Sequence, residues 1–199
     1  MAKIKPALTL AIIAAIISCL VIVVYKLTYK DTSLEVTDKE YDAVSAIYGG
    51  EKADYTVLPL ESYPEAILTT GADGVKSCMV PEIKKIIKKN DGSVAFSLEV
   101  KGYKSGFGIM VGVSENAVSG VSVVTVGEET PGLGTNAAKP EFLEQFNGIS
   151  GTAEIVKSNP DVSKGQVQAV TSATYSSKGV ANAVNLALEA YRLCGGDFE

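Results

Sequence analysis

The sequence contains no histidine and only three cysteines, which lie far apart. Without histidine, the chain cannot form a Ser-His-Asp triad, a Cys-His pair, a His-ligated haem or a His-containing zinc site. Cys19, Cys78 and Cys194 have neither the even number of a disulfide framework nor the spacing of metal ligands. A bridge between Cys78 and Cys194 stays open. We therefore expect no metal site and no catalytic residue of these enzyme types.

Clustered positive charge is also scarce. The chain has a formal net charge of -5, and its one concentration of basic residues is formed by Lys84, Lys85, Lys88 and Lys89. Because a nucleic-acid-binding surface needs a basic patch or stripe, we expect no nucleic acid as a partner. The four lysines are interpreted as a solvated face.

One long apolar run is present near the N-terminus. Residues 7–25 carry no charge, and this length is close to the roughly 20 apolar residues that a membrane-spanning helix needs. We therefore expect residues 1–30 to form a transmembrane anchor in the lipid bilayer. Lysines flank the run on both sides, and the free amino terminus favours a cytoplasmic N-terminus. Lipidation at Cys19 is the disfavoured alternative, since the apolar run continues to Tyr25.

The remaining chain predicts a single α+β domain that follows a linker. In the linker, residues 31–80, Thr37 and Glu40 have the spacing of a capping box for a short helix that ends at Gly49. The rest of the linker is irregular, apart from a possible strand at 55–58. Residues 81–199 are expected to form the folded domain.

Hydrophobic periodicity gives the elements of this domain. Alternation predicts strands at 94–100, 109–115 and 120–126, and their short connections indicate an antiparallel sheet. A further strand is predicted at 153–157, and a short helix at 140–146.

Two longer helices complete the expected architecture. At 82–90, Ile83, Ile86 and Ile87 fall on one helical stripe, which predicts a helix. At 176–193, the buried stripe is formed by Val180, Val184, Leu188 and Tyr191, with Ser176 or Ser177 as the N-cap.

Two polar loops interrupt this architecture. In 128–134, a Pro-Gly pair suits a type II turn, which brings backbone amides to the surface; a plain reverse turn is the simpler interpretation. In 170–177, several hydroxyl side chains precede the last helix, whose free N–H groups and dipole favour a phosphate. A helix start with more hydroxyl residues than one N-cap needs explains the second loop equally well.

The motifs of these loops resemble a known family. ETPGLG at Glu129–Gly134, FLEQF with a following glycine at 142–148, and TSATYSS at Thr171–Ser177 occur in the order and spacing of the G subunit of the Rnf electron-transport complex. The related C subunit of the sodium-pumping NADH:quinone reductase is also similar. The resemblance extends from the apolar N-terminal run to the last helix and is strongest at 102–184.

The resemblance implies a covalently bound FMN. Thr174 matches the threonine that carries FMN through a phosphoester bond made by a separate flavin transferase. The residues implied near the phosphate are Thr171, Ser172, Ala173, Ser176 and Ser177, and those near the ring system are Glu129, Thr130, Gly132 and Leu133. Gln168 stands where family members often have Asp, and Ser172 where they often have Gly.

The function implied by the resemblance is electron relay. The chain would be an extracytoplasmic flavoprotein subunit of a membrane complex that moves electrons between ferredoxin and NAD, coupled to Na⁺ or H⁺ transport, with the other Rnf subunits as partners. From the residues alone, the alternative is a membrane-anchored module that binds a phosphorylated ligand, or nothing, and has no redox activity.

Overall fold

The computed structural model describes residues 10, 12–22, 34–70 and 76–198. The chain divides into two units, Met1–Thr32 and Ser33–Glu199. In the first unit, residues 12–22 are helical and their large apolar side chains are exposed. No helix within the described ranges is both long and apolar enough to cross a membrane. The rest of the predicted anchor, residues 1–9, 11 and 23–30, lies outside the described residues.

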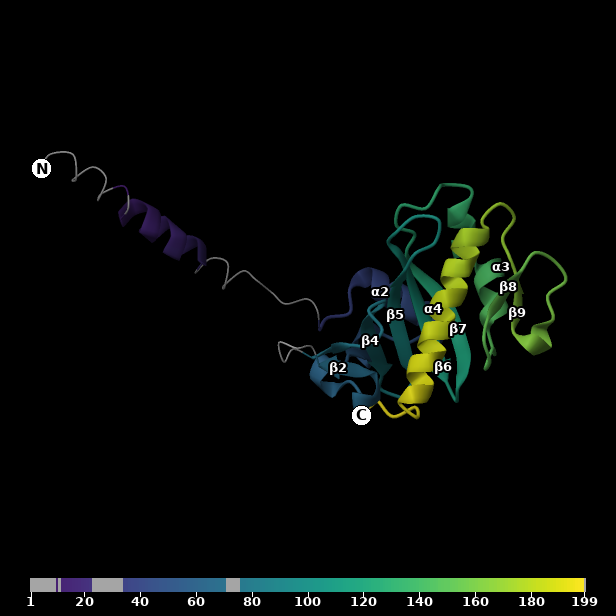
Figure 1. Ribbon diagram of the computed structural model, residues 1–199. Coiled ribbons are helices and arrows are strands. Elements are labelled where there is room, and N and C mark those ends of the chain that lie inside the picture. Colours follow the sequence, from purple (N-terminus) through teal and green to yellow (C-terminus); the bar gives the residue numbers. More distant parts are fainter. Residues whose placement is uncertain (1–9, 11, 23–33, 71–75, 199) are drawn as a thin grey trace, which may run out of the picture. The chain divides into compact units, whose positions relative to one another are not determined.

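A five-stranded antiparallel sheet forms the centre of the second unit (Figure 1), with the strand order β1-β4-β5-β6-β7. Its strands are β1 (Tyr55–Val57), β4 (Ile83–Lys89), β5 (Val94–Val100), β6 (Phe107–Ser114) and β7 (Ala117–Thr125). The three consecutive strands predicted from alternation are therefore confirmed as β5, β6 and β7. The α+β class is confirmed with them.

Helices cover both faces of this sheet. The long helix α4 (Thr174–Leu193) crosses one face (Figure 1), and α2 (Asp38–Tyr48) packs on the other. Side chains of β5 alternate between the two cores: Phe96 packs with the α4 side, whereas its neighbour Ala95 packs with the α2 side. The predicted capping box of α2, formed by Thr37 and Glu40, is present.

The smaller elements surround this core. The predicted short helix is confirmed as α3 (Pro140–Leu143), which continues into the 3-10 turn η5 (Glu144–Phe146). Two short strand pairs complete the sheets: β2 (Leu68–Thr70) with β3 (Lys76–Cys78), antiparallel, and β8 (Glu154–Val156) with β9 (Gln166–Gln168), parallel. Further 3-10 turns are η1 (Lys52–Asp54), η2 (Leu60–Ser62), η3 (Glu65–Ile67), η4 (Gly134–Ala138) and η6 (Val162–Lys164).

The helix predicted at 82–90 is wrong, because this segment is strand β4. An irregularity between Ile83 and Lys85 shifts the register against β5. A bulge of this kind changes which residues share a face of the strand, so Ile83 and Ile86, three residues apart, both join the core on the α4 side. Ile87 joins the opposite core. The bulge therefore produces the three-residue spacing that was interpreted as helical.

The lysines of β4 do not form a solvated face either. The Lys85 ammonium lies 2.9 Å from a carboxylate oxygen of the buried Glu40, and the Lys88 ammonium donates to the Phe198 carbonyl at 2.7 Å. Of the four lysines in the cluster, Lys84 is the one that is exposed. Lys85 and Lys88 thus hold α2 and the C-terminal segment to the sheet.

Replacing Lys85 by Ala should lower the free energy of unfolding by about 2–3 kcal/mol, because the buried carboxylate of Glu40 then loses its counter-charge. Lys84→Ala removes the same side chain from an exposed position of the same strand and should change stability by less than about 0.5 kcal/mol. Urea unfolding of the two variants measures the difference. Equal losses would contradict a stabilising role for the ion pair.

Candidate functional site

The candidate site lies at the N-terminal end of α4. This helix begins at Thr174, two residues earlier than predicted, with Ala173 as an N-cap that makes no side-chain capping bond. The predicted caps are therefore wrong, since Ser176 and Ser177 lie in the first turn. The first N–H groups of a helix have no intrahelical acceptor, and its dipole places partial positive charge at this end. An anion is favoured there.

The two serines instead bind neighbouring segments. Ser177 is fully buried; its hydroxyl donates to the Ala173 carbonyl at 2.9 Å and accepts from the Val170 N–H at 3.0 Å. Ser176 donates from its hydroxyl to a Glu129 carboxylate oxygen at 2.7 Å. The first turn of α4 is thus held to the loop that precedes it and to the 128–134 loop.

Glu129 connects three segments that are distant in the sequence. The residue is only 4% exposed. One carboxylate oxygen accepts from Ser176 on α4, and the other accepts from the backbone N–H of Lys104 at 2.9 Å. The carboxylate therefore joins the 102–106 bend, the 128–134 loop and the start of α4.

Two glycines leave the space that this carboxylate occupies. A Cβ at Gly134 would collide with the Glu129 carboxylate and lie 2.9 Å from the Ser176 hydroxyl oxygen. A Cβ at Gly102 would also collide with the carboxylate and lie 3.2 Å from the Ser176 Cα. Close packing of the three segments around Glu129 therefore depends on both residues having no side chain.

A cavity of about 200 Å³ opens beside Glu129. Seven of the ten site residues predicted from the sequence line it: Glu129, Thr130, Leu133, Ser172, Ala173, Thr174 and Ser176. The fold thus brings the two polar loops together at one place. Thr174 is half-buried and is the first residue of the helix.

Three predicted residues do not line this cavity. Ser177 is fully buried, and its hydroxyl is engaged in the two hydrogen bonds described above. Thr171 faces a neighbouring groove of about 460 Å³, which Lys139 and Gln168 also line. Gly132 has a φ of 75°, and the Leu133 N–H donates to the Thr130 carbonyl at 3.1 Å. Gly132 therefore forms the predicted turn and does not line the cavity.

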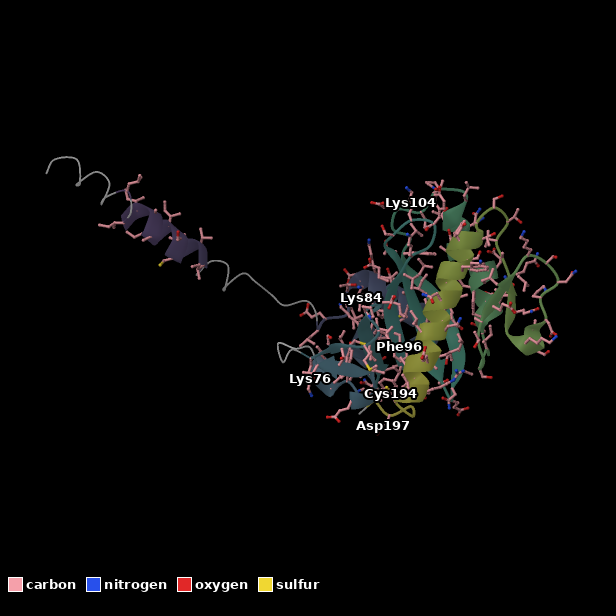
Figure 2. The ribbon with its side chains drawn as sticks, in the orientation of Figure 1. Lys76, Lys84, Phe96, Lys104, Cys194 and Asp197 are labelled. Carbon is pink, nitrogen blue, oxygen red and sulfur yellow. The ribbon has the colours of Figure 1, made fainter. Side chains whose placement is uncertain are left out.

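The sequence interpretation missed Tyr103, Gly134 and Tyr175, which complete the cavity lining. The two tyrosine rings lie with their centroids 6.4 Å apart and are 60% and 69% exposed. Figure 2 shows Lys104, the neighbour of Tyr103, at the end of the domain where α4 begins. Tyr175 directly follows Thr174, so its place in the motif was an available signal. Tyr103 reaches the site only through the fold.

The lining of the cavity combines apolar walls with N–H donors, and this combination suits a planar ring system joined to a phosphate. Leu133, Tyr103 and Tyr175 provide apolar and aromatic walls, while the α4 N-terminus provides N–H groups and positive potential. Such combinations of apolar walls with a few polar groups are typical of cofactor sites. Among the described residues, no cluster of three His, Cys, Asp or Glu side chains is arranged to hold a metal ion.

Comparison with protein families finds a match over the part of the chain that contains this cavity. Residues 102–189 match the model of the FMN-binding domain, and this range includes every residue that lines the cavity. This stretch of the chain is therefore similar to the FMN-binding domain.

Three proteins that are similar to the chain are G subunits of ion-translocating oxidoreductase complexes. The G subunit of the Na⁺-translocating ferredoxin:NAD⁺ oxidoreductase complex of Acetobacterium woodii is 25% identical over 70% of this chain and 68% of its own length. The G subunit of the proton-translocating ferredoxin:NAD⁺ oxidoreductase complex of Clostridium ljungdahlii is 35% identical over 51% of this chain and 56% of that protein. The G subunit of the ion-translocating oxidoreductase complex of Aliivibrio fischeri is 28% identical over 94% of this chain and 90% of that protein.

Among solved structures, NqrC of Shewanella oneidensis is similar. It is 23% identical, with a TM-score of 0.49, and the match covers 66% of this chain and 68% of that chain. The C subunit of the Na⁺-translocating NADH-quinone reductase of Parabacteroides distasonis has a TM-score of 0.46 at 19% identity, over 64% of this chain and 75% of that chain.

Ser172→Gly should stabilise the domain by about 1 kcal/mol. Ser172 has a φ of 63°, in the left-handed region that a side chain disfavours and glycine adopts freely. Ser172→Ala, which keeps a Cβ, should stay within about 0.5 kcal/mol of the original protein. Thermal unfolding of both variants tests this, and destabilisation by glycine would show that the Ser172 side chain holds the loop.

Gly134→Ala should destabilise the domain by about 2 kcal/mol or more. The added methyl group would displace the Glu129 carboxylate from its two donors, and a buried charged group that loses its hydrogen bonds carries a cost of this order. Gly151→Ala is the matched control, since nothing lies within 4 Å of a Cβ built there. Denaturant unfolding compares them; similar stabilities would refute the tight packing at Gly134.

Proposed function

We propose that this chain is the FMN-carrying electron-relay subunit of an ion-translocating ferredoxin:NAD oxidoreductase complex. The observation that carries the proposal is that the match to the FMN-binding domain contains the entire lining of the α4 cavity. The names of the homologous G subunits support the ferredoxin:NAD reaction. When bound, FMN supplies reversible electron uptake and release. The chain itself binds, orients and shields this group.

In this proposal, Thr174 is the point of attachment. Its hydroxyl would form a phosphoester with FMN, made by a separate flavin transferase. The position supports this role, because the first residue of a long helix places the phosphate beside free N–H groups and the positive end of the dipole. Leu133, Tyr103 and Tyr175 supply the apolar surface for the ring system. A covalent link retains FMN outside the cytoplasm, where lost cofactor would not be replaced.

The proposal also includes a location and partners. Residues 1–30 would anchor the chain in the lipid bilayer with the N-terminus in the cytoplasm, and the FMN-binding domain would lie outside. The uncharged run at 7–25 supports a membrane anchor. The other subunits of the complex would contact this chain, in line with the complexes named for the homologues.

Thr174→Ala should abolish covalent flavin, whereas Thr171→Ala should retain it, because Thr171 faces the neighbouring groove. The full chain is produced together with a flavin transferase and denatured. Flavin fluorescence of the gel band and the intact mass are then measured, since a phosphoester-linked FMN adds a fixed increment.

A dark band from the unchanged protein would favour a phosphate-binding module without redox activity. Loss of fluorescence in Thr171→Ala alone would mean that the acceptor hydroxyl is the other threonine. Circular dichroism of each variant checks that the fold is intact.

A further inference from the structure

The carboxylate of Glu129 is a buried charged group at the candidate site. It is buried, it lines the α4 cavity, and each of its oxygens accepts one hydrogen bond. Both donors, the Ser176 hydroxyl and the Lys104 N–H, are uncharged. Each oxygen of the carboxylate therefore has one hydrogen-bond partner.

No cation within the described ranges forms an ion pair with this carboxylate. The ion pairs in that part of the chain join Lys52 to Asp38, Lys85 to Glu40, Lys89 to Asp91 and Lys164 to Asp161. Glu129 is in none of them. The nearby Lys104 ammonium lies 5.9 Å from the centroid of the Tyr103 ring.

Glu40 provides a comparison within the same molecule. It is the other buried glutamate among the described residues, at 7% exposed against 4% for Glu129. Lys85 lies 2.9 Å from its carboxylate. Among the described residues, the fold therefore pairs one buried glutamate with a lysine away from the cavity, and it leaves the buried glutamate at the cavity outside any ion pair.

A buried charge that has no ion-pair partner acts strongly on a redox group beside it. Electrostatic interactions are strengthened where burial excludes water, and charge placed near a flavin ring is one of the means by which a protein tunes the cofactor. We propose that Glu129 sets the reduction potential of the bound flavin, holding it low because its negative charge opposes the arrival of an electron in the cavity. This inference rests on the proposed FMN occupancy.

Glu129→Gln separates the charge from the hydrogen bonds. The glutamine carbonyl can accept from the Lys104 N–H, and its amide can donate to Ser176, because a serine hydroxyl both donates and accepts. The size of the side chain is kept. Glu128→Gln is the matched control, since it removes the same charge from the adjacent, exposed position of the loop, where solvent and salt screen it.

The experiment is a spectroelectrochemical titration of the full-length, flavin-loaded protein. Glu129→Gln should shift the midpoint potential to more positive values, and Glu128→Gln should shift it much less. A Glu129→Gln potential equal to that of the unchanged protein, or equal shifts in both variants, would overturn the inference. An unchanged protein that carries no flavin overturns the proposed function and this inference together.

A second measurement applies if Glu129→Gln does not load flavin. The unchanged protein is labelled with ¹³C-glutamate, and its reduced-minus-oxidised infrared difference spectrum is recorded. A glutamate beside the flavin should give a carboxylate band that shifts with the label. Its absence would mean that no glutamate interacts with the redox group, and the inference would fail while flavin binding stands.

Discussion

The hydrogen-bonded carboxylate of Glu129 is the constraint on which the candidate site depends. It joins the backbone of Lys104, 25 residues before it, to the side chain of Ser176, 47 residues after it. Gly102 and Gly134 leave the space for this contact. The cavity is therefore assembled only when the sheet, the loop and the helix are all in place, and its walls are fixed by one buried side chain.

The two-sided core explains how such a contact is kept in position. The sheet is covered on one face by α4 and on the other by α2, so its strands provide a rigid support. α4 also closely approaches the segment that follows β5: a Cβ at Gly179 would lie 2.9 Å from the Lys101 carbonyl oxygen. The start of α4 is thus fixed by packing along the helix, and no side-chain cap is needed to place it.

Local patterns in the sequence were sufficient for much of this fold. Alternation identified β5 to β7, and the spacing of Thr37 and Glu40 identified the start of α2. The start of α4 was placed two residues late, because the prediction relied on a side-chain cap that is absent. Strand β4 was mistaken for a helix, because a bulge changed its periodicity. Both errors come from backbone geometry that side-chain spacing does not report.

Only part of the candidate site could be predicted from the sequence. The two loops were recognisable as motifs, whereas the place of Tyr103 and the anchoring of Glu129 depend on contacts between distant segments.

These loops also differ from the sheet in how they open. β5 has a strand on each side and a core on each face. We therefore expect its amides to exchange with solvent through global unfolding, whereas exposed loops open locally at low cost. We therefore expect the exposed loops around the cavity to open locally while the hydrogen bonds of the sheet stay intact.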